Sequence, residues 1–134
     1  MRYQRAELPV KLDGLEAARS FFAGCFANAD PAVENLWVAH VDDRARCVHL
    51  SRHGGDAAST PLPLHSIIAD AAAHKSAGLV LAHNHPSGDA TPSALDCAAT
   101  KRLALAAEAL DCTVVDHLVF AGGECTSLRR MGLL

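Results

Sequence analysis

Two histidines one residue apart, His83 and His85, form the pattern in this sequence with the clearest chemical potential. They end an apolar run, residues 78–82, that is typical of a buried strand. Because alternate side chains of an extended segment point the same way, both imidazoles can face one point. The spacing therefore predicts a pair of metal ligands at the end of a strand.

A hydroxyl and a carboxylate follow on the next predicted helix. Thr91 is a typical helix N-cap and Pro92 a typical first helical residue, so we expect a helix over residues 92–110. Ser93 and Asp96 then lie one turn apart on one face of it. Two imidazoles and one carboxylate suit a zinc ion, and three protein ligands leave a fourth position open to water. The pattern indicates a metal-hydrolase site.

Hydrolysis at such a site needs a base that lies near the metal without binding it. Glu34 is our candidate because it begins a predicted strand that we expect beside the histidine strand; a solvated carboxylate is the alternative. Ser93 could donate a hydrogen bond to an oxyanion, or could instead cap the helix by accepting one from a backbone N–H. Spacing alone does not separate these two roles of the serine.

Other titratable residues are weaker candidates. Asp89 follows His85 by four residues and could reach a metal, but an aspartate in a Ser-Gly-Asp-Ala turn commonly bonds its own backbone. Asp116 and His117 lie in a later apolar strand, and we interpret them as a hydrogen-bonded structural pair. The alternative is that this pair hydrogen-bonds to the metal ligands and so orients them.

The remaining histidines show no clear partner ligands in the sequence. One weak cluster consists of Cys47, His49 and His53. A loop predicted after Ser51 would leave the last of these poorly fixed. The others are interpreted as ordinary surface or core histidines: His40, His65 and His74.

The elements that must position these residues follow from periodicity and turn signals. We expect helices over residues 12–27, 64–75 and 92–110. We expect strands over residues 34–41, 45–51, 78–82, 112–120 and 124–127. A hairpin turn is expected at 42–44 and a loop at 54–63. This order predicts one α/β domain built around a mixed sheet.

Composition narrows the class of protein. A chain of 134 residues is ordinarily one domain, and its net charge of −3 argues against a strongly basic nucleic-acid surface. No stretch is long enough to span a membrane and the N-terminus has no apolar signal region, so we expect a cytoplasmic protein. The cysteines are odd in number, scattered and never spaced C-x-x-C, which favours buried free thiols: Cys25, Cys47, Cys97, Cys112 and Cys125.

The candidate residues also resemble a known motif. His83-x-His85, seven residues, Ser93, two residues and Asp96 is similar to the JAMM motif of JAB/MPN-domain metalloproteases. Three further segments resemble the bacterial RadC family: residues 81–89, 116–119 and 127–134. The resemblance covers most of the chain from about Glu34 onward and is most specific around the two histidines.

The resemblance has implications for the site. It implies that His83, His85 and Asp96 bind Zn²⁺, that Ser93 stabilises an oxyanion and that Glu34 is the catalytic glutamate. It implies a hydrolase of the metallopeptidase type that cleaves a peptide or isopeptide bond in a peptide or protein substrate. The alternative is a non-catalytic binding module associated with DNA repair or mobile-element pathways.

The resemblance also has implications for fold and partners. It implies one RadC-like JAB/MPN domain over residues 1–134, with an N-terminal helix within residues 1–30 packed on it. The expected fold is a mixed, curved sheet flanked by helices, as in cytidine-deaminase-like architectures. We expect no membrane partner, while nucleic-acid binding and the oligomeric state, a dimer included, are left open.

Three departures from the family pattern stand out. The segment at 64–66 reads Leu-His-Ser where family members often carry Pro-Arg-Glu, so any role of that arginine is absent or replaced. His40 interrupts a strand that usually reads as continuously apolar. The helix-hairpin-helix module of longer RadC proteins is missing from this sequence, so the acidic chain gives the DNA-repair label little physical support.

Overall fold

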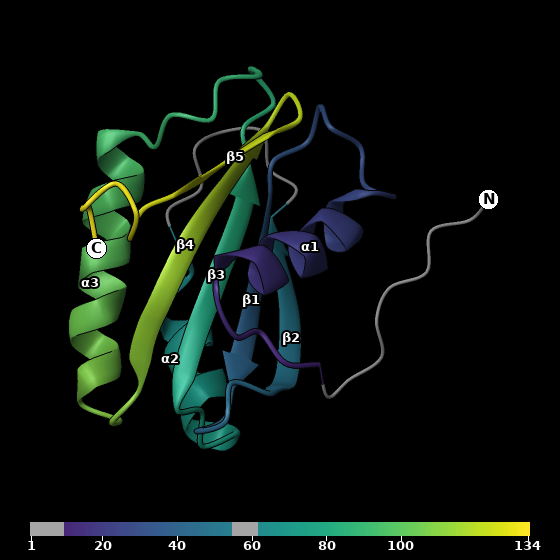
Figure 1. Cartoon of the computed structure of the whole chain (residues 1–134). Coiled ribbons are helices and arrows are strands. Elements are labelled where there is room, and N and C mark those ends of the chain that lie inside the picture. The colour runs from purple at the N-terminus through teal and green to yellow at the C-terminus, as the bar shows by residue number, and fades with distance from the viewer. Residues whose placement is uncertain (1–9, 55–61) are drawn as a thin grey trace.

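A mixed β-sheet organises the residues that the computed structural model describes, which are 10–54 and 62–134 (Figure 1). The helices are α1 (Leu15–Phe26), α2 (Leu64–Ala73) and α3 (Ala94–Glu108). The strands are β1 (Asn35–Val41), β2 (Cys47–Gly54), β3 (Gly78–Asn84), β4 (Thr113–Ala121) and β5 (Glu124–Ser127). This order of elements confirms the predicted α/β class with a mixed sheet.

The strand order in the sheet is β2-β1-β3-β4-β5. Strands β3 and β4 are parallel and are joined through α3, while the other neighbouring pairs are antiparallel. Parallel neighbours need such a crossover because a short hairpin cannot connect them. In the β1–β3 pair Leu36 lies opposite His83, so the start of β1 lies beside the end of β3.

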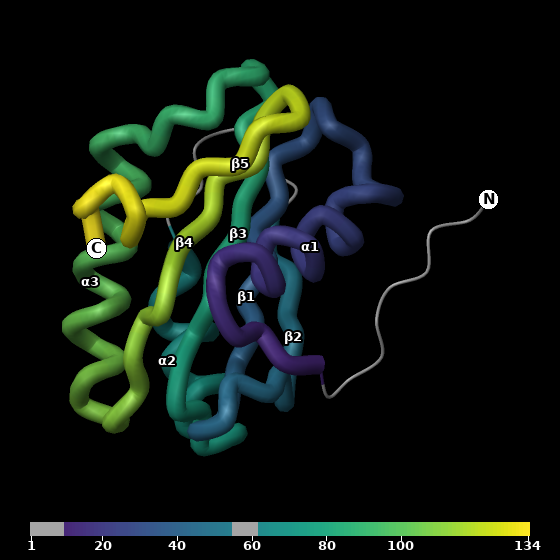
Figure 2. The backbone as a smooth tube through the Cα atoms, viewed as in Figure 1, coloured from purple at the N-terminus to yellow at the C-terminus, as the bar shows by residue number. Residues whose placement is uncertain are grey.

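Helices cover both faces of the sheet (Figure 2). Helix α1 packs Phe21 and Phe22 against one face, in a core cluster with residues of β1, β3 and β4. Helices α2 and α3 bury Ile67 and Leu103 against the other face, in a cluster that includes Val38. Side chains alternate along a strand, so the polar residues of each strand are divided between these two environments.

Several predicted boundaries shift in the structure. Strand β3 extends to Asn84, and β2 extends to Gly54, so His53 lies in a strand and the loop predicted directly after Ser51 is wrong. Residues 55–61 of the predicted loop and residues 1–9 lie outside the described residues. Three of the cysteines are buried, namely Cys25, Cys47 and Cys112. The other two, Cys97 and Cys125, are half-buried. Across the two described ranges, no helix combines the length and apolar character needed to cross a membrane.

Candidate metal centre

The end of β3 and the start of α3 bring three predicted ligands together. His83 Nε2 lies 2.9 Å from His85 Nε2 and 3.4 Å from Asp96 Oδ2, and His85 Nε2 lies 3.1 Å from the same oxygen. Ligand atoms on a tetrahedral zinc ion, bonded at about 2.0–2.1 Å, lie roughly 3.3 Å from one another. The three side chains therefore have the spacing of a zinc ligand set.

A backbone contact sets the tautomer of His85. Its Nδ1 lies 2.8 Å from the carbonyl oxygen of Asp89, which can only accept a hydrogen bond. The neutral ring therefore carries its proton on Nδ1 and keeps a lone pair on Nε2. The carboxylate of Asp89 accepts from the N–H of Thr91 at 3.0 Å, as its turn predicts, so this alternative ligand is engaged elsewhere.

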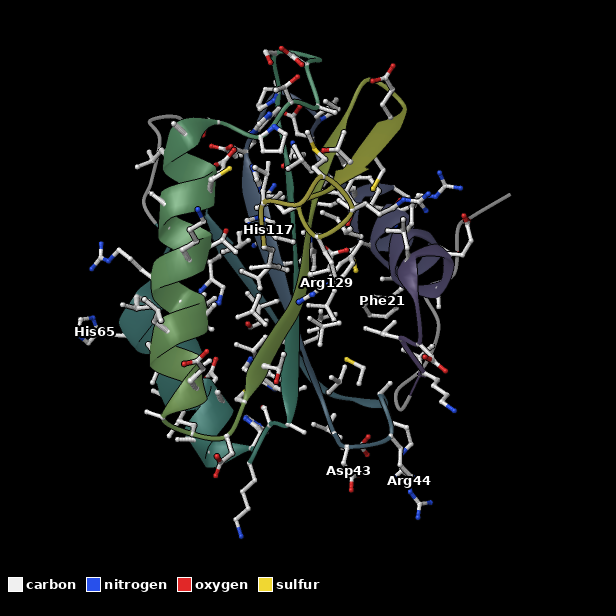
Figure 3. All side chains as sticks on the ribbon, turned by 60° about the vertical axis from the view of Figure 1, so that its left-hand side comes forward. Phe21, Asp43, Arg44, His65, His117 and Arg129 are labelled. Carbon is white, nitrogen blue, oxygen red and sulfur yellow. The ribbon has the colours of Figure 1, made fainter. Side chains whose placement is uncertain are left out.

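A buried chain of hydrogen bonds sets the tautomer of His83 in the same way. Thr100 Oγ1 donates to the carbonyl of Asp96 at 2.7 Å, so it must accept from His117 Nδ1, also at 2.7 Å. His117 Nε2 then accepts from His83 Nδ1 at 2.6 Å, which leaves the lone pair of His83 on Nε2. Thr100 is 0% and His117 2% exposed, and Figure 3 shows His117 inside the molecule.

The charge states agree with this chain of donors. Burial, helped by the nearby His83, lowers the pKa of His117 to about 3, so its ring is neutral at pH 7. Burial by itself would raise the pKa of Asp96, but the nearby imidazole of His83 and the hydrogen bonds made with Ser93 outweigh it and hold the pKa well below its usual range. With the Nδ1 protons engaged in these hydrogen bonds, Nε2 of His83 and Nε2 of His85 are the nitrogens that face the Asp96 carboxylate. Three donor atoms at these separations fit a divalent metal ion placed between them.

Ser93, rather than Thr91, is the N-cap of α3. The helix begins at Ala94, and Ser93 Oγ accepts from the backbone N–H of Asp96 at 2.9 Å. In return Asp96 Oδ2 accepts from the backbone N–H of Ser93 at 2.9 Å, which completes a capping box. The reciprocal bond made by Asp96 decides between the two hydroxyl residues. Capping occupies a lone pair of Ser93 and leaves its hydroxyl proton for another acceptor.

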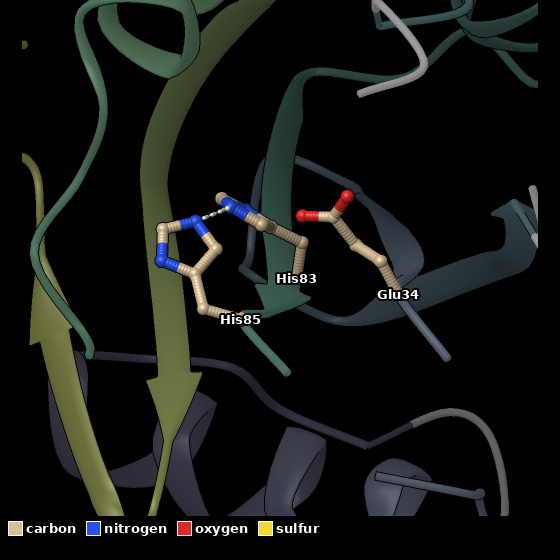
Figure 4. A group of neighbouring side chains, drawn as sticks. All are labelled: Glu34, His83 and His85. Atoms are coloured by element: carbon tan, nitrogen blue, oxygen red, sulfur yellow. Dashed lines mark hydrogen bonds between the residues drawn. The ribbon is translucent and has the colours of Figure 1, made fainter. Parts of the chain in front are cut away.

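Glu34 reaches the same place from the start of β1. Its carboxylate points toward His83, and His85 approaches from the other side (Figure 4). One ligand atom from each of these three residues lies within 4.8 Å of the other two, so they too form a group that could hold a metal ion. The structure thus brings together the five residues singled out from the sequence: Glu34, His83, His85, Ser93 and Asp96.

Asn84 and Gly54 hold the backbone around Glu34, and sequence reasoning missed both. Asn84 Oδ1 accepts from the N–H of Asn35 at 2.7 Å, and its Nδ2 donates to the carbonyl of Val33 at 2.9 Å. Gly54 approaches so closely that a Cβ there would lie 2.9 Å from the carbonyl oxygen of Glu34. The position of Asn84 between two histidines was a usable signal, because alternation directs it away from their shared point.

Asp116 and His117 have separate roles. Asp116 Oδ1 accepts from the backbone N–H groups of His117 and Arg129, and its Oδ2 accepts from the hydroxyl of Ser127. These contacts fix the C-terminal turn to β4, so the structural interpretation holds for Asp116. The ring of His117 instead contacts His83, which is the supporting position that the sequence left open.

The weak cluster predicted on β2, which consists of Cys47, His49 and His53, does not form as predicted. His40 pairs with His49, but the next residue, Val41, pairs with Cys47, so one residue of β2 is left over in a β-bulge. The bulge reverses the alternation, and Cys47 joins the core on the α1 face. Its thiol contacts the backbone carbonyl of His49 at 3.5 Å, whereas the ring of His49 contacts Asp70 of α2 and the adjoining His74.

The candidate ligands open into a cavity of about 410 Å³. Ligand sites in proteins commonly enclose roughly 300–1,000 Å³. Apolar side chains supply part of the wall: Leu36, Leu62, Pro63, Leu95 and Ala99. The cavity therefore combines a compact polar centre with apolar surface on which a substrate side chain can rest.

Fold and site together define a small α/β domain with a candidate metal centre at the end of its central strand. Residues 13–133 match the family model described as the RadC-like JAB domain. The chain belongs to this family.

Individual relatives agree with that assignment. The chain is 38% identical over 129 residues to the UPF0758 protein YfjY of Escherichia coli K12, covering 96% of this chain and 79% of the relative. It is 29% identical over 132 residues to a UPF0758 protein of Coprothermobacter proteolyticus, covering 98% and 55%. A UPF0758 protein of Chloroflexus aggregans is 38% identical over 101 residues, covering 75% and 44%. The chain thus spans about half the length of the last two relatives.

Proposed function

We propose that this protein is a zinc-dependent hydrolase that cleaves a peptide or isopeptide bond. The observation that carries the proposal is the convergence of three ligand atoms within 3.4 Å of one another, with a further carboxylate beside them. His83, His85 and Asp96 would hold the zinc ion. When bound, zinc would supply a Lewis acid that polarises a carbonyl group and lowers the pKa of a water molecule.

Glu34 would act as the general base and then the general acid. Its carboxylate accepts a proton from the attacking water and passes it to the leaving nitrogen as the C–N bond breaks. Asn84 binds the backbone on both sides of Glu34 and leaves the carboxylate oxygens of Glu34 unused. Because Asn84 binds the residues on both sides of Glu34, the backbone at Glu34 is held at the wall of the cavity.

Ser93 would stabilise the oxyanion. Its hydroxyl proton and the N-terminal end of α3 both favour negative charge at this edge of the cavity. The apolar wall supports a substrate that presents an apolar side chain next to the scissile bond. Since the chain is shorter than several relatives, the choice of substrate is proposed for the domain alone.

The test compares Glu34→Gln with Glu108→Gln, a change at an exposed glutamate on α3. Each zinc-loaded protein is incubated with a mixed peptide library and with isopeptide-linked lysine peptides, and products are identified by mass spectrometry. We expect Glu34→Gln to keep its zinc content and to lose about 10²–10⁴-fold in cleavage rate. We expect His83→Ala to lose zinc from this centre and activity together.

Two results would contradict the proposal. One is a zinc-loaded wild-type protein that cleaves neither kind of probe. The other is a Glu34→Gln variant that cleaves as fast as Glu108→Gln. DNA binding that weakens with salt, in a protein without hydrolytic activity, would instead favour the binding-module alternative.

A further inference from the structure

A second group of histidines gathers on the α2 side of the sheet, at the other end of β1. His40 on β1 lies directly opposite His49 on β2, with ring centroids 5.1 Å apart. Asp70 of α2 places Oδ2 3.7 Å from His49 Nε2. One ligand atom from each of the three residues lies within 4.8 Å of the other two. His40 is a core histidine, as expected, but β2 and α2 supply neighbours for it that the sequence pattern does not reveal.

His40 has a nitrogen that the surrounding protein does not satisfy. The side chain is 0% exposed, and its Nδ1 is hydrogen-bonded to Ser76 Oγ at 2.8 Å. Its Nε2 is buried and has no hydrogen-bond partner within the described part of the chain. Burial, with a smaller effect of His49, lowers the pKa of His40 to about 4, so the ring is neutral at pH 7. A neutral imidazole anchored at one nitrogen and open at the other is the usual state of a metal-binding histidine.

His74 brings a third imidazole next to the group. It lies one helical turn after Asp70, and its ring stacks on that of His49 with centroids 3.9 Å apart and planes 14° apart. Its Nδ1 donates to the carbonyl of Asp70 at 2.9 Å, which leaves the lone pair of the neutral ring on Nε2. Two or three imidazoles with one carboxylate favour Zn²⁺ and similar transition-metal ions over Mg²⁺ or Ca²⁺.

We propose that His40, His49 and Asp70 form a second binding site for a divalent transition-metal ion. The site is separate from the candidate centre at His83. That histidine lies opposite Leu36, four residues before His40, which corresponds to about 13 Å along β1. An ion bound at the second site would join β1, β2 and α2 through side chains that make few other strong bonds to one another.

The test isolates the second site by removing a ligand of the first. Zn²⁺ alone is added to His85→Ala protein by equilibrium dialysis, and bound zinc per chain is measured by elemental analysis. We expect one zinc ion per chain in this variant and two in the wild type. We expect Asp70→Asn or His49→Gln, added to His85→Ala, to reduce the remaining zinc at least tenfold.

Matched controls and a second readout keep the test decisive. Asp111→Asn and His65→Gln change the same residue types at exposed positions outside the cluster, and they should leave zinc binding unchanged; Figure 3 shows His65 pointing away from the molecule. Ring-nitrogen NMR of His85→Ala should show zinc-dependent shifts for His40 and His49 but not His65, and it needs no further substitution.

Three outcomes would overturn this proposal. His85→Ala protein that binds no zinc would do so, as would double variants that bind as much zinc as their controls. Zinc that binds His85→Ala without moving the ring signals of His40 and His49 would also do so. Because none of these measurements requires hydrolysis, failure of the proposed enzymatic activity would leave the result intact.

Discussion

Replacing Thr100 with valine tests whether the hydrogen bonds that run from Thr100 through His117 set the tautomer of the candidate metal ligand His83. The change removes a hydroxyl and keeps the shape of the side chain. In the native protein this hydroxyl donates to the carbonyl of Asp96 and accepts from His117 Nδ1. Without it, His117 can carry its proton on Nε2, and His83 Nδ1 must then accept. The proton of His83 moves to Nε2, the nitrogen that zinc requires.

The structure gives the expected size of the effect. Loss of a partner behind a metal ligand typically costs 10–100-fold in metal affinity, or about 1.4–2.7 kcal/mol. Because Thr100 and His117 are both buried, leaving Nδ1 of His117 without a hydrogen-bond partner should also lower the free energy of unfolding by about 1–3 kcal/mol. A domain stable by roughly 5–15 kcal/mol would remain folded.

The assay measures zinc affinity by competition with a chelator, in an Asp70→Asn background that removes the second proposed site. Thr113→Val, at an exposed threonine at the start of β4, is the control. Ring-nitrogen NMR of the metal-free proteins reports the tautomers of His83 and His117. Equal zinc affinities for the Thr100→Val and Thr113→Val proteins, with unchanged tautomers, would refute the reasoning.

Two other predictions concern stability. Gly54→Ala should lower the free energy of unfolding in urea by about 1–3 kcal/mol, more than Gly14→Ala. Both glycines have positive φ, 127° and 97°, but only a Cβ at Gly54 would meet the carbonyl of Glu34; equal losses would contradict this explanation. Burial lowers the pKa of His40 to about 4 and of His117 to about 3, from 6.5. Below about pH 6.5 these two histidines bind protons in the unfolded, metal-free chain but stay neutral in the folded chain. The free energy of unfolding therefore falls as the pH drops. Urea unfolding should show a loss of roughly 2 kcal/mol per histidine between pH 7 and 5, and a flat profile would argue against neutral buried rings.

The residues of the first centre could be found from the sequence because their signals are local. Alternation within one strand pairs His83 with His85, and the helix that follows places Asp96 one turn from its start. The N-cap was misplaced because Thr91 and Ser93 both have suitable side chains. Only the reciprocal bond from Asp96, a capping box three residues on, distinguishes them.

The second group of ligands could not be found this way because it depends on contacts between elements. His40 and His49 lie side by side because of the register of β1 and β2, which includes a β-bulge. No residue type in the sequence indicates this bulge. Asp70 joins them only because α2 packs over that end of the sheet. The hydrogen bonds that support His83 likewise link Thr100 on α3 with His117 on β4. The sequence pattern of either element gives no indication of this contact.

The capping box restricts how this centre could change by evolution or design. Asp96 is both a candidate metal ligand and the acceptor that completes the first turn of α3. A cysteine or histidine at this position would supply a different metal donor but no carboxylate oxygen for the N–H of Ser93. A change of metal preference there would therefore also loosen the start of the helix. His85 is less constrained, because its outer partner is a backbone carbonyl that stays in place when the side chain is exchanged.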